Sequence, residues 1–528
     1  MRRPTGSGVA GGDGPDAPEP DEAVDVAIVG AGFGGLGMAA RLRREGTRSF
    51  VVIDGGDGIG GTWRDNTYPG AACDVPSTLY SFSFFPSTWP RRFSGQRDIL
   101  AYLERLVDEH GLGPFLRMGA RVERMDFDEG SARWHLRLDD RRLVSARAVV
   151  SAVGQLNRPA VPDIEGVERF AGPSWHSARW DHSVDLAGKR VAVVGTGASA
   201  VQFVPEVAKV AARTVVFQRS APYVLPKMDR PYSRLERAVH ERVRAVQLAD
   251  RLRVYLTGET LGLGIVRSRR LLAALTALWR RSMHAQVADP QLRLACEPDY
   301  VMGCKRVLFS NDWYRTLARP DVDLVTDPVA EVTATGVRTV SGREEQVDAI
   351  IFGTGFATSD VLAPVEVTGL GGRSLREEWS DGASAHLGVT VSGYPNLFLL
   401  YGPNTNLGSN SIVFMLEAQI GYVLGALQAL DRERLAWVDV RADVQRRFAA
   451  WVDATSRRTA WTSGCHSWYT TTDGRNTNNW PSFTFVYRWR LRRFDLLDHT
   501  VMPLRASPLA TAAPPPASAT WATAAGSR

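Results

Sequence analysis

The sequence predicts an α/β fold with two Rossmann-like domains and a helical insertion, because two glycine-rich turns each join an apolar strand to a helical pattern. The first turn follows the β-branched run 24–29 and reads Gly30, Ala31, Gly32, Phe33, Gly34, Gly35. The second follows the run 190–194 and reads Gly195, Thr196, Gly197, Ala198, Ser199, Ala200. Such turns let the backbone approach a pyrophosphate, which the amides and positive end of the next helix then bind. We therefore expect one dinucleotide at each turn.

The residue that closes the second strand of each unit distinguishes the two dinucleotides. Asp54 follows the strand 50–53, whereas Arg219 and Ser220 follow the strand 214–218. A carboxylate accepts hydrogen bonds from a ribose diol, and a guanidinium beside a hydroxyl suits a 2′-phosphate. We therefore predict FAD at the first turn and NADPH at the second.

The order of apolar runs predicts that each domain is discontinuous in sequence. We expect the FAD-binding domain at 23–154 and 358–505, since the strand 395–401 and the helix 411–430 return to it late in the chain. The NADP-binding domain is expected at 155–222 and 300–357, with its last strand at 347–352. Residues 1–22 and 506–528 are rich in Gly, Pro, Ala and Ser, which predicts disordered tails.

The segment 223–299 divides the NADP-binding domain and shows helical periodicity. Its leucines and valines recur three to five positions apart between arginines, which predicts a helical insertion. An arginine-rich helical face is usually solvated. Binding of a partner or of a membrane surface is the alternative.

Composition indicates a large globular enzyme. The chain has 528 residues, of which 44% are hydrophobic and 23% charged, with a formal net charge of +6. Its basic residues alternate with acids and form no nucleic-acid-binding module, so we expect no nucleic-acid partner. Segments such as 271–278 and 412–424 are too short or too interrupted for a membrane span, and no signal peptide is evident at the N-terminus. We therefore expect a cytoplasmic protein of undetermined oligomeric state.

The four cysteines show no metal-like spacing. Cys73, Cys296, Cys304 and Cys465 contain no C-x-x-C pair, so they are interpreted as reduced thiols. The missing pair also argues against a flavin disulfide reductase.

One motif between the two turns is specific enough to indicate a family. Residues 170–181 carry Phe170, Gly172, His176, Trp180 and Asp181, which fit the fingerprint F-x-G-x-x-x-H-x-x-x-W followed by Pro or Asp. In this the chain resembles the Baeyer-Villiger monooxygenases, a family of class B flavoprotein monooxygenases. The segments 60–63, 68–74, 303–306, 353–356 and 467–469 extend the resemblance over about residues 24–500.

The resemblance implies a reaction. NADPH would reduce FAD, dioxygen would form a C4a-peroxyflavin, and the peroxide would convert a ketone into an ester or lactone. Arg306 would be the cation that stabilises the peroxide, and Asp74 would hold this arginine. Both are the catalytic candidates, and Asp74 and Arg306 are also expected to contact the cofactors.

The resemblance also implies cofactor-binding residues beyond the two turns. Lys305 would join Arg219 and Ser220 at the 2′-phosphate. The remaining candidates are Thr62, Trp63, Tyr80, Val122, Gln155 and Trp468. Family members usually have Glu where this chain has Asp54, and a carboxylate is retained. His176 is expected to be a structural hinge residue rather than a general base.

Two other function classes stay open at this point. A flavin monooxygenase that oxidises nitrogen or sulfur in a small molecule shares both turns but usually departs from the pattern at 170–181. A flavin-binding module without catalysis is the other. The segment 404–409 is expected where flavin and substrate meet, and it predicts no particular substrate.

Overall fold

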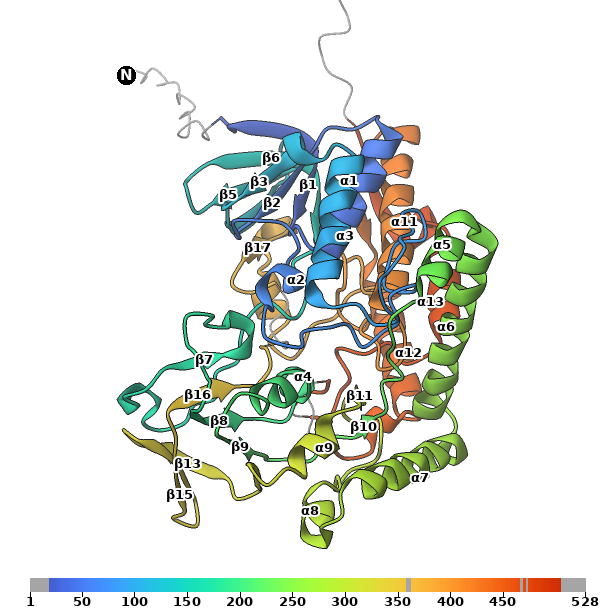
Figure 1. The fold of residues 1–528 in the computed structure, drawn as a ribbon. Coiled ribbons are helices and arrows are strands. Elements are labelled where there is room, and N and C mark those ends of the chain that lie inside the picture. Colours follow the sequence, from blue (N-terminus) through green and yellow to red (C-terminus); the bar gives the residue numbers. More distant parts are fainter. Residues whose placement is uncertain (1–18, 358–361, 466–468, 472, 505–528) are drawn as a thin grey trace, which may run out of the picture.

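A computed structural model shows a larger mixed sheet and a smaller parallel sheet, one above the other in Figure 1. It describes residues 19–357, 362–465, 469–471 and 473–504. The larger sheet has eight strands, in the order β17-β4-β5-β6-β1-β2-β3, with β18 paired to β6. Its strands are β1 (Glu22–Val29), β2 (Phe50–Asp54), β3 (Leu116–Met118), β4 (Val122–Asp128), β5 (Arg133–Leu138), β6 (Leu143–Ser151), β17 (Glu366–Thr368) and β18 (Leu397–Leu399).

The central strand β1 is buried on both faces, as its continuous apolar sequence predicts. Val26 and Ile28 pack on the side of helix α1 (Phe33–Glu45), and Ala27 and Val29 pack on the opposite side. Helices α3 (Gln96–Glu109) and α11 (Ile412–Arg432) lie beside α1 on the same face (Figure 1).

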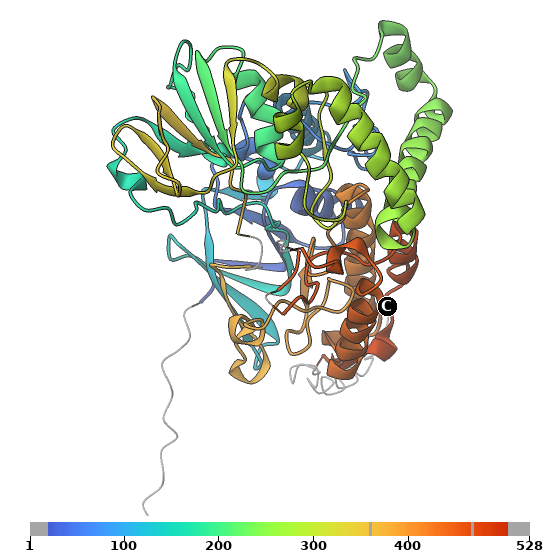
Figure 2. The ribbon, with the colours of Figure 1, turned by 90° about the horizontal axis from the view of Figure 1, so that it is seen from below.

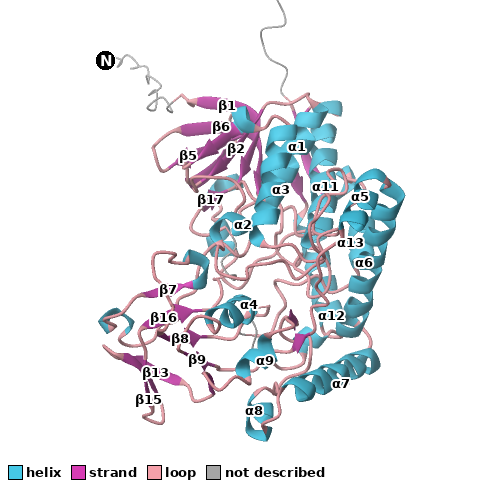
Figure 3. Cartoon of the chain, in the orientation of Figure 1, coloured by secondary structure: helices cyan, strands magenta, loops and turns pink. Residues whose placement is uncertain are grey.

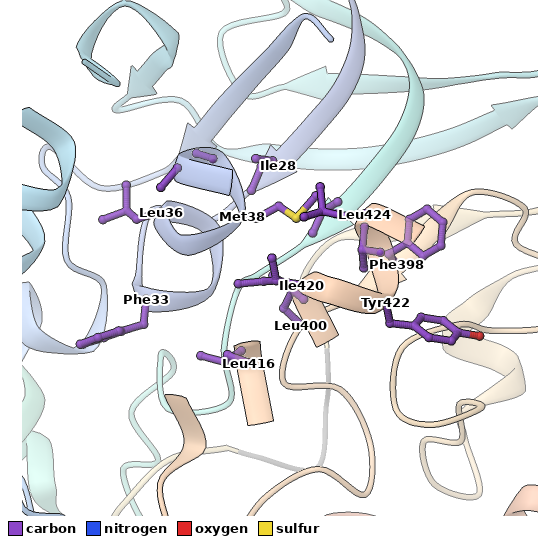
Figure 4. Packing of buried hydrophobic residues seen from close by; sticks show 14 of the residues in the cluster. Ile28, Phe33, Leu36, Met38, Phe398, Leu400, Leu416, Ile420, Tyr422 and Leu424 are labelled. Atoms are coloured by element: carbon purple, nitrogen blue, oxygen red, sulfur yellow. The ribbon is translucent and has the colours of Figure 1, made fainter. Parts of the chain in front are cut away.

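Helix α11 is the core helix of this unit. It is long and apolar enough to span a membrane by length and composition, but 61% of its most apolar window is buried inside the protein. In Figure 4, Ile420 and Leu424 of α11 lie against Met38 of α1 and the sheet residue Phe398. Its hydrophobicity is therefore explained by packing.

The smaller sheet is entirely parallel and carries the second glycine turn. Its order is β12-β9-β8-β16-β7, and helix α4 (Ala198–Val207) follows its central strand. The strands are β7 (Ser174–His176), β8 (Arg190–Val194), β9 (Arg213–Phe217), β12 (Val322–Val325) and β16 (Ala349–Phe352). A three-stranded antiparallel sheet of β13 (Val329–Val332), β14 (Gly336–Thr339) and β15 (Glu344–Gln346) adjoins it.

Four helices make up most of the predicted insertion and extend along one side of both sheets (Figures 1 and 2). They are α5 (Arg234–Arg242), α6 (Arg244–Val266), α7 (Arg269–Gln286) and α8 (Pro290–Ala295). Before them, β10 (Val224–Leu225) pairs with β11 (Leu308–Phe309), so the chain leaves and re-enters at neighbouring places. Helix α6 exposes Leu248, Leu252 and Leu256 beside charged residues.

The remaining elements are short or C-terminal. They are α2 (Thr62–Asp65), α9 (Trp313–Leu317), α10 (Leu375–Glu378), β19 (Leu435–Val440), α12 (Ala442–Ser456), α13 (Thr484–Arg490) and β20 (His499–Pro503). Single 3-10 turns occupy Gly113–Phe115, Val167–Arg169, Ser177–Arg179, Leu370–Gly372, Ala460–Thr462 and Leu496–Asp498. In Figure 3, loops fill most of the space where the two sheets face each other.

One predicted boundary needs correction. Strand β1 begins at Glu22, and the amide of Asp21 already donates to the Leu143 carbonyl at 2.9 Å, so the N-terminal tail predicted at 1–22 is too long. Backbone pairing with β6 orders these polar residues, which composition alone does not reveal. Residues 1–18 and 505–528 lie outside the described residues, and the domain boundaries stay predictions.

Candidate functional site

The first glycine turn lies where β1 passes into α1. Gly30 has φ +110°, and a Cβ there would lie 2.5 Å from the carbonyl oxygen of Ala152. Helix α1 begins after Gly32, and no side chain caps its first amides. The turn is therefore close-packed on one side and presents uncapped amides at the other, as a pyrophosphate site requires.

The second turn repeats this geometry between β8 and α4. Gly195 has φ +107°, a Cβ there would lie 2.6 Å from the carbonyl oxygen of Gly353, and the helix N-cap Gly197 offers no side-chain cap. Two predicted residues have a packing role instead of lining the site. A Cβ at Gly35 would overlap the Gly30 carbonyl, and Ala200 is fully buried below its turn.

One cavity of about 1750 Å³ connects the two turns. This exceeds the roughly 300–1,000 Å³ of an ordinary small-molecule pocket, so it suits two large ligands. The predicted residues that line it are Gly30, Gly32, Phe33, Asp54, Thr62, Trp63, Asp74, Tyr80, Val122, Gln155, Gly195, Thr196, Gly197, Ala198, Ser199, Arg219, Ser220, Lys305 and Arg306. Trp468 lies outside the described residues.

Asp54 is bound to the first turn itself. Its carboxylate accepts hydrogen bonds from the amide of Ala31 at 2.7 Å and from the amide of Gly56 at 2.8 Å. Arg64, which sequence reasoning missed, donates to the same carboxylate at 3.3 Å. A carboxylate has about four acceptor positions, so one remains for a ribose hydroxyl. The residues present therefore fit the adenosine half of FAD.

A cationic cluster lies beside the second turn. Lys305 Nζ donates to Ser220 Oγ at 2.9 Å and lies 4.6 Å from the ring centroid of Tyr300. Burial lowers the pKa of Lys305; Asp299 raises it and the nearby Arg219 lowers it further. Neither Lys305 nor Arg219 forms an ion pair within the described part of the chain. This cluster fits a phosphate dianion.

Arg306 and Asp74 form an ion pair in the same cavity. Asp74 comes from the loop between α2 and α3, and Arg306 directly precedes β11, so the two reach the pair from segments far apart in the chain. The attraction of Asp74 is the main cause that raises the pKa of Arg306. Among the described residues, Asp74 is the only hydrogen-bond partner of this guanidinium, so N–H donors remain for a ligand.

Tyr401 is a cavity residue that sequence reasoning missed. Its hydroxyl donates to Asn406 Oδ1 at 2.6 Å, and its backbone has φ +63°, which is uncommon outside glycine. Burial raises its pKa to about 12, while Arg306 lowers it and Asp74 raises it. Its place two residues after the end of strand β18 was the available signal, because binding residues often follow strand ends in such folds.

Direct contacts join the two halves of the cavity. Gln202 on α4 accepts from the Tyr68 hydroxyl at 3.0 Å and donates to the Ala72 carbonyl at 2.9 Å. His182 Nε2 lies 2.8 Å from Thr67 Oγ1.

His176 is buried, its Nδ1 accepts from the amide of Ala178 at 3.1 Å, and burial lowers its pKa.

The interpretation of all four cysteines as thiols is wrong for two of them. Cys304 and Cys465 form a disulfide across 161 positions, with Cα atoms 6.3 Å apart, while Cys73 and Cys296 are free and buried. The spacing of cysteines in a sequence reveals only pairs that are close in the chain, such as C-x-x-C. These two cysteines are brought together by the tertiary fold.

Comparison with known proteins agrees with this geometry. Residues 24–252 match the family of pyridine nucleotide-disulphide oxidoreductases. A Baeyer-Villiger monooxygenase from Streptomyces coelicolor is 44% identical over 91% of this chain and 93% of its own. One from Pseudomonas aeruginosa is 44% identical over 89% and 90%, respectively. The solved structure of OTEMO in complex with FAD and NADP superposes with a TM-score of 0.81, at 27% identity over 92% of this chain and 100% of that one.

Proposed function

The chain belongs to the family of Baeyer-Villiger monooxygenases, and we propose from this that its cavity converts a ketone into an ester or lactone with FAD, NADPH and dioxygen. The enzyme is an NADPH-dependent flavin monooxygenase, and its fold belongs to the α/β class. The proposal concerns the residues that perform the reaction and the class of substrate.

When it is bound, FAD supplies the chemistry of the reaction: it can accept hydride from NADPH and activate dioxygen. The first turn would bind its pyrophosphate, with Asp54 at the ribose and Arg64 supporting this carboxylate. The second turn would bind the pyrophosphate of NADPH, and Arg219, Ser220 and Lys305 would bind its 2′-phosphate. The helix amides and the cationic cluster thus orient both cofactors toward the space between the sheets.

The ion pair of Arg306 with Asp74 is the observation that carries the proposed mechanism. Asp74 binds one edge of the guanidinium and limits its motion, while the other N–H groups stay free to stabilise negative charge that develops during oxygen transfer. A cation that is already in place needs no reorganisation during the reaction.

Product analysis tests this function directly. The purified enzyme with FAD, NADPH and a panel of cyclic, linear and aryl ketones should form esters or lactones that carry one atom of ¹⁸O from labelled dioxygen. The same panel should include thioethers and tertiary amines. Formation of sulfoxides or N-oxides with no ester from any ketone would favour the heteroatom monooxygenase instead.

We also propose that the enzyme works in the cytoplasm. The support is that α11, the one helix of spanning length and composition in the described part of the chain, is mostly buried in the core. Fractionation of the source cells with an antibody to the chain should recover it with cytoplasmic markers, and recovery from the exported fraction would contradict this assignment.

A further inference from the structure

The disulfide between Cys304 and Cys465 lies next to the two cations that the proposed function uses. Lys305 and Arg306 directly follow Cys304 in sequence. Lys305 binds Ser220 of the NADP side, and Arg306 binds Asp74 of the FAD side. Three consecutive residues are therefore attached to three different parts of the chain.

No regular element holds this segment. Residues 303–307 form neither helix nor strand, and the chain enters β11 only at Leu308. A backbone outside helix and strand has more freedom than a strand even where, as here, the amide of Cys304 donates to the Val301 carbonyl at 3.0 Å. The long Lys and Arg side chains add rotamer freedom. The covalent bond to Cys465 limits this freedom directly before the two functional residues.

The surroundings of the disulfide are tightly packed. Cys304 is fully buried, and its sulfur also lies 3.8 Å from the carbonyl oxygen of Trp461. A Cβ at Gly303 would lie 3.0 Å from Ile265 and 3.4 Å from Ala460. The disulfide thus connects the 303–306 segment to the 460–465 segment. Both segments pack against the end of helix α6, where separate parts of the fold are in close contact.

We propose that the Cys304–Cys465 disulfide is a positioning element that holds Lys305 for NADPH binding and Arg306 for oxygen transfer. This inference rests on the function proposed above. Structural disulfides are uncommon in cytoplasmic proteins, because cellular thiols keep cysteines reduced there and the disulfides that do form are usually transient. Reduction by a dithiol delivers two electrons and two protons to the two sulfurs, so the products are two thiols and the oxidised dithiol.

The first measurement is peptide mapping of protein that is purified with free thiols blocked and without reductant. A peptide that links Cys304 to Cys465 is expected, and its absence would overturn the proposal. The enzyme is then compared before and after reduction by dithiothreitol, alongside Cys304→Ser and Cys465→Ser. Cys296→Ala is the control, since Cys296 is a free, buried thiol outside the cavity lining.

Loss of the bond is expected to raise the Kd of NADP⁺ and the KM of NADPH about tenfold, because two long side chains must then be ordered on binding. The ratio of hydrogen peroxide released to NADPH consumed should also rise, while FAD content stays the same. A lower melting temperature with unchanged NADP⁺ affinity and peroxide ratio would show a purely stabilising bond and overturn the proposal.

The readouts separate this proposal from the proposed function. The Kd of NADP⁺ is measured by titration of the flavin absorbance without any ketone, so it is informative even if no ketone is oxidised. If the serine variants fold poorly, the reduced wild-type enzyme still provides the comparison. Failure of the oxidised wild type to oxygenate any ketone would reject the function, whereas equal NADP⁺ affinity before and after reduction would reject the positioning role.

Discussion

Arg306 and Asp74 form an ion pair across 232 positions of the chain, between the segment directly before β11 and the loop between α2 and α3. The pair therefore exists only when the two dinucleotide-binding units are correctly placed against each other. It lies in the cavity shared by both glycine turns, where we propose that it links cofactor binding to chemistry.

Arg306→Ala should retain FAD but lose ester formation by about 10²–10³-fold, because a preorganised charge at the reacting atoms is removed. The measurement is ester production per NADPH consumed, with FAD content read from absorbance. Asp74→Ala should produce a smaller loss of the same kind. Arg169→Ala is the control, since this exposed arginine forms ion pairs with the exposed Glu165 and Glu168 and does not line the cavity. Ester formation by Arg306→Ala at the wild-type rate would remove the residue from the mechanism.

Arg219→Ala should weaken NADPH binding by about 10- to 150-fold, which is the loss of a charge-assisted phosphate contact worth roughly 1.5–3 kcal/mol. The KM of NADH should stay nearly the same, because NADH lacks the 2′-phosphate. Steady-state kinetics with both nucleotides provide the comparison. Equal use of NADH and NADPH by the wild-type enzyme would contradict the cofactor assignment.

The affinity for NADPH should fall at alkaline pH earlier than a normal lysine would cause. Burial and Arg219 lower the pKa of Lys305, and a lysine is charged only below its pKa. As pH rises through this lowered value, the cation that binds the phosphate is lost and the KM of NADPH rises. Lys305→Arg should move this rise to higher pH, because a guanidinium keeps its charge. An unchanged pH profile in the arginine variant would exclude Lys305 as the titrating group.

Two glycines should respond in opposite ways to alanine. A Cβ at Gly37 on α1 would collide with the ring of Phe82 and approach Ile420 at 3.1 Å, so Gly37→Ala should destabilise the fold by about 1–3 kcal/mol. Gly421 on α11 is exposed and has open space around its Cβ position, so Gly421→Ala should stabilise the fold by about 0.4–1 kcal/mol. Thermal unfolding of the FAD-bound proteins checks both signs, and the same sign for both variants would contradict the packing that the structure shows around these two glycines.

The sequence by itself predicted those features that are local in the chain. A glycine turn, the strand before it and the helix after it occupy about 20 consecutive residues, and the carboxylate or cation that selects the cofactor ends the next strand. For this reason Asp54 and Arg219 could be identified from spacing. The buried strands of both sheets, such as 24–29 and 190–194, could also be predicted from the sequence, because burial on both faces requires a continuous apolar run.

Apart from the pairs of Arg306 with Asp74 and of Lys305 with Ser220, which the family resemblance implied, only the tertiary structure decided which distant residues meet. The support of Asp54 by Arg64, the contact of Gln202 with Tyr68 and the place of Tyr401 depend on the path of the loops between regular elements, and loops have no periodicity from which a partner can be inferred. The same holds for Glu22, whose place in β1 comes from pairing with β6 rather than from its own polarity. The disulfide of Cys304 with Cys465 shows this most clearly, since two sulfurs bond when folding brings them together and sequence separation carries no information about that distance.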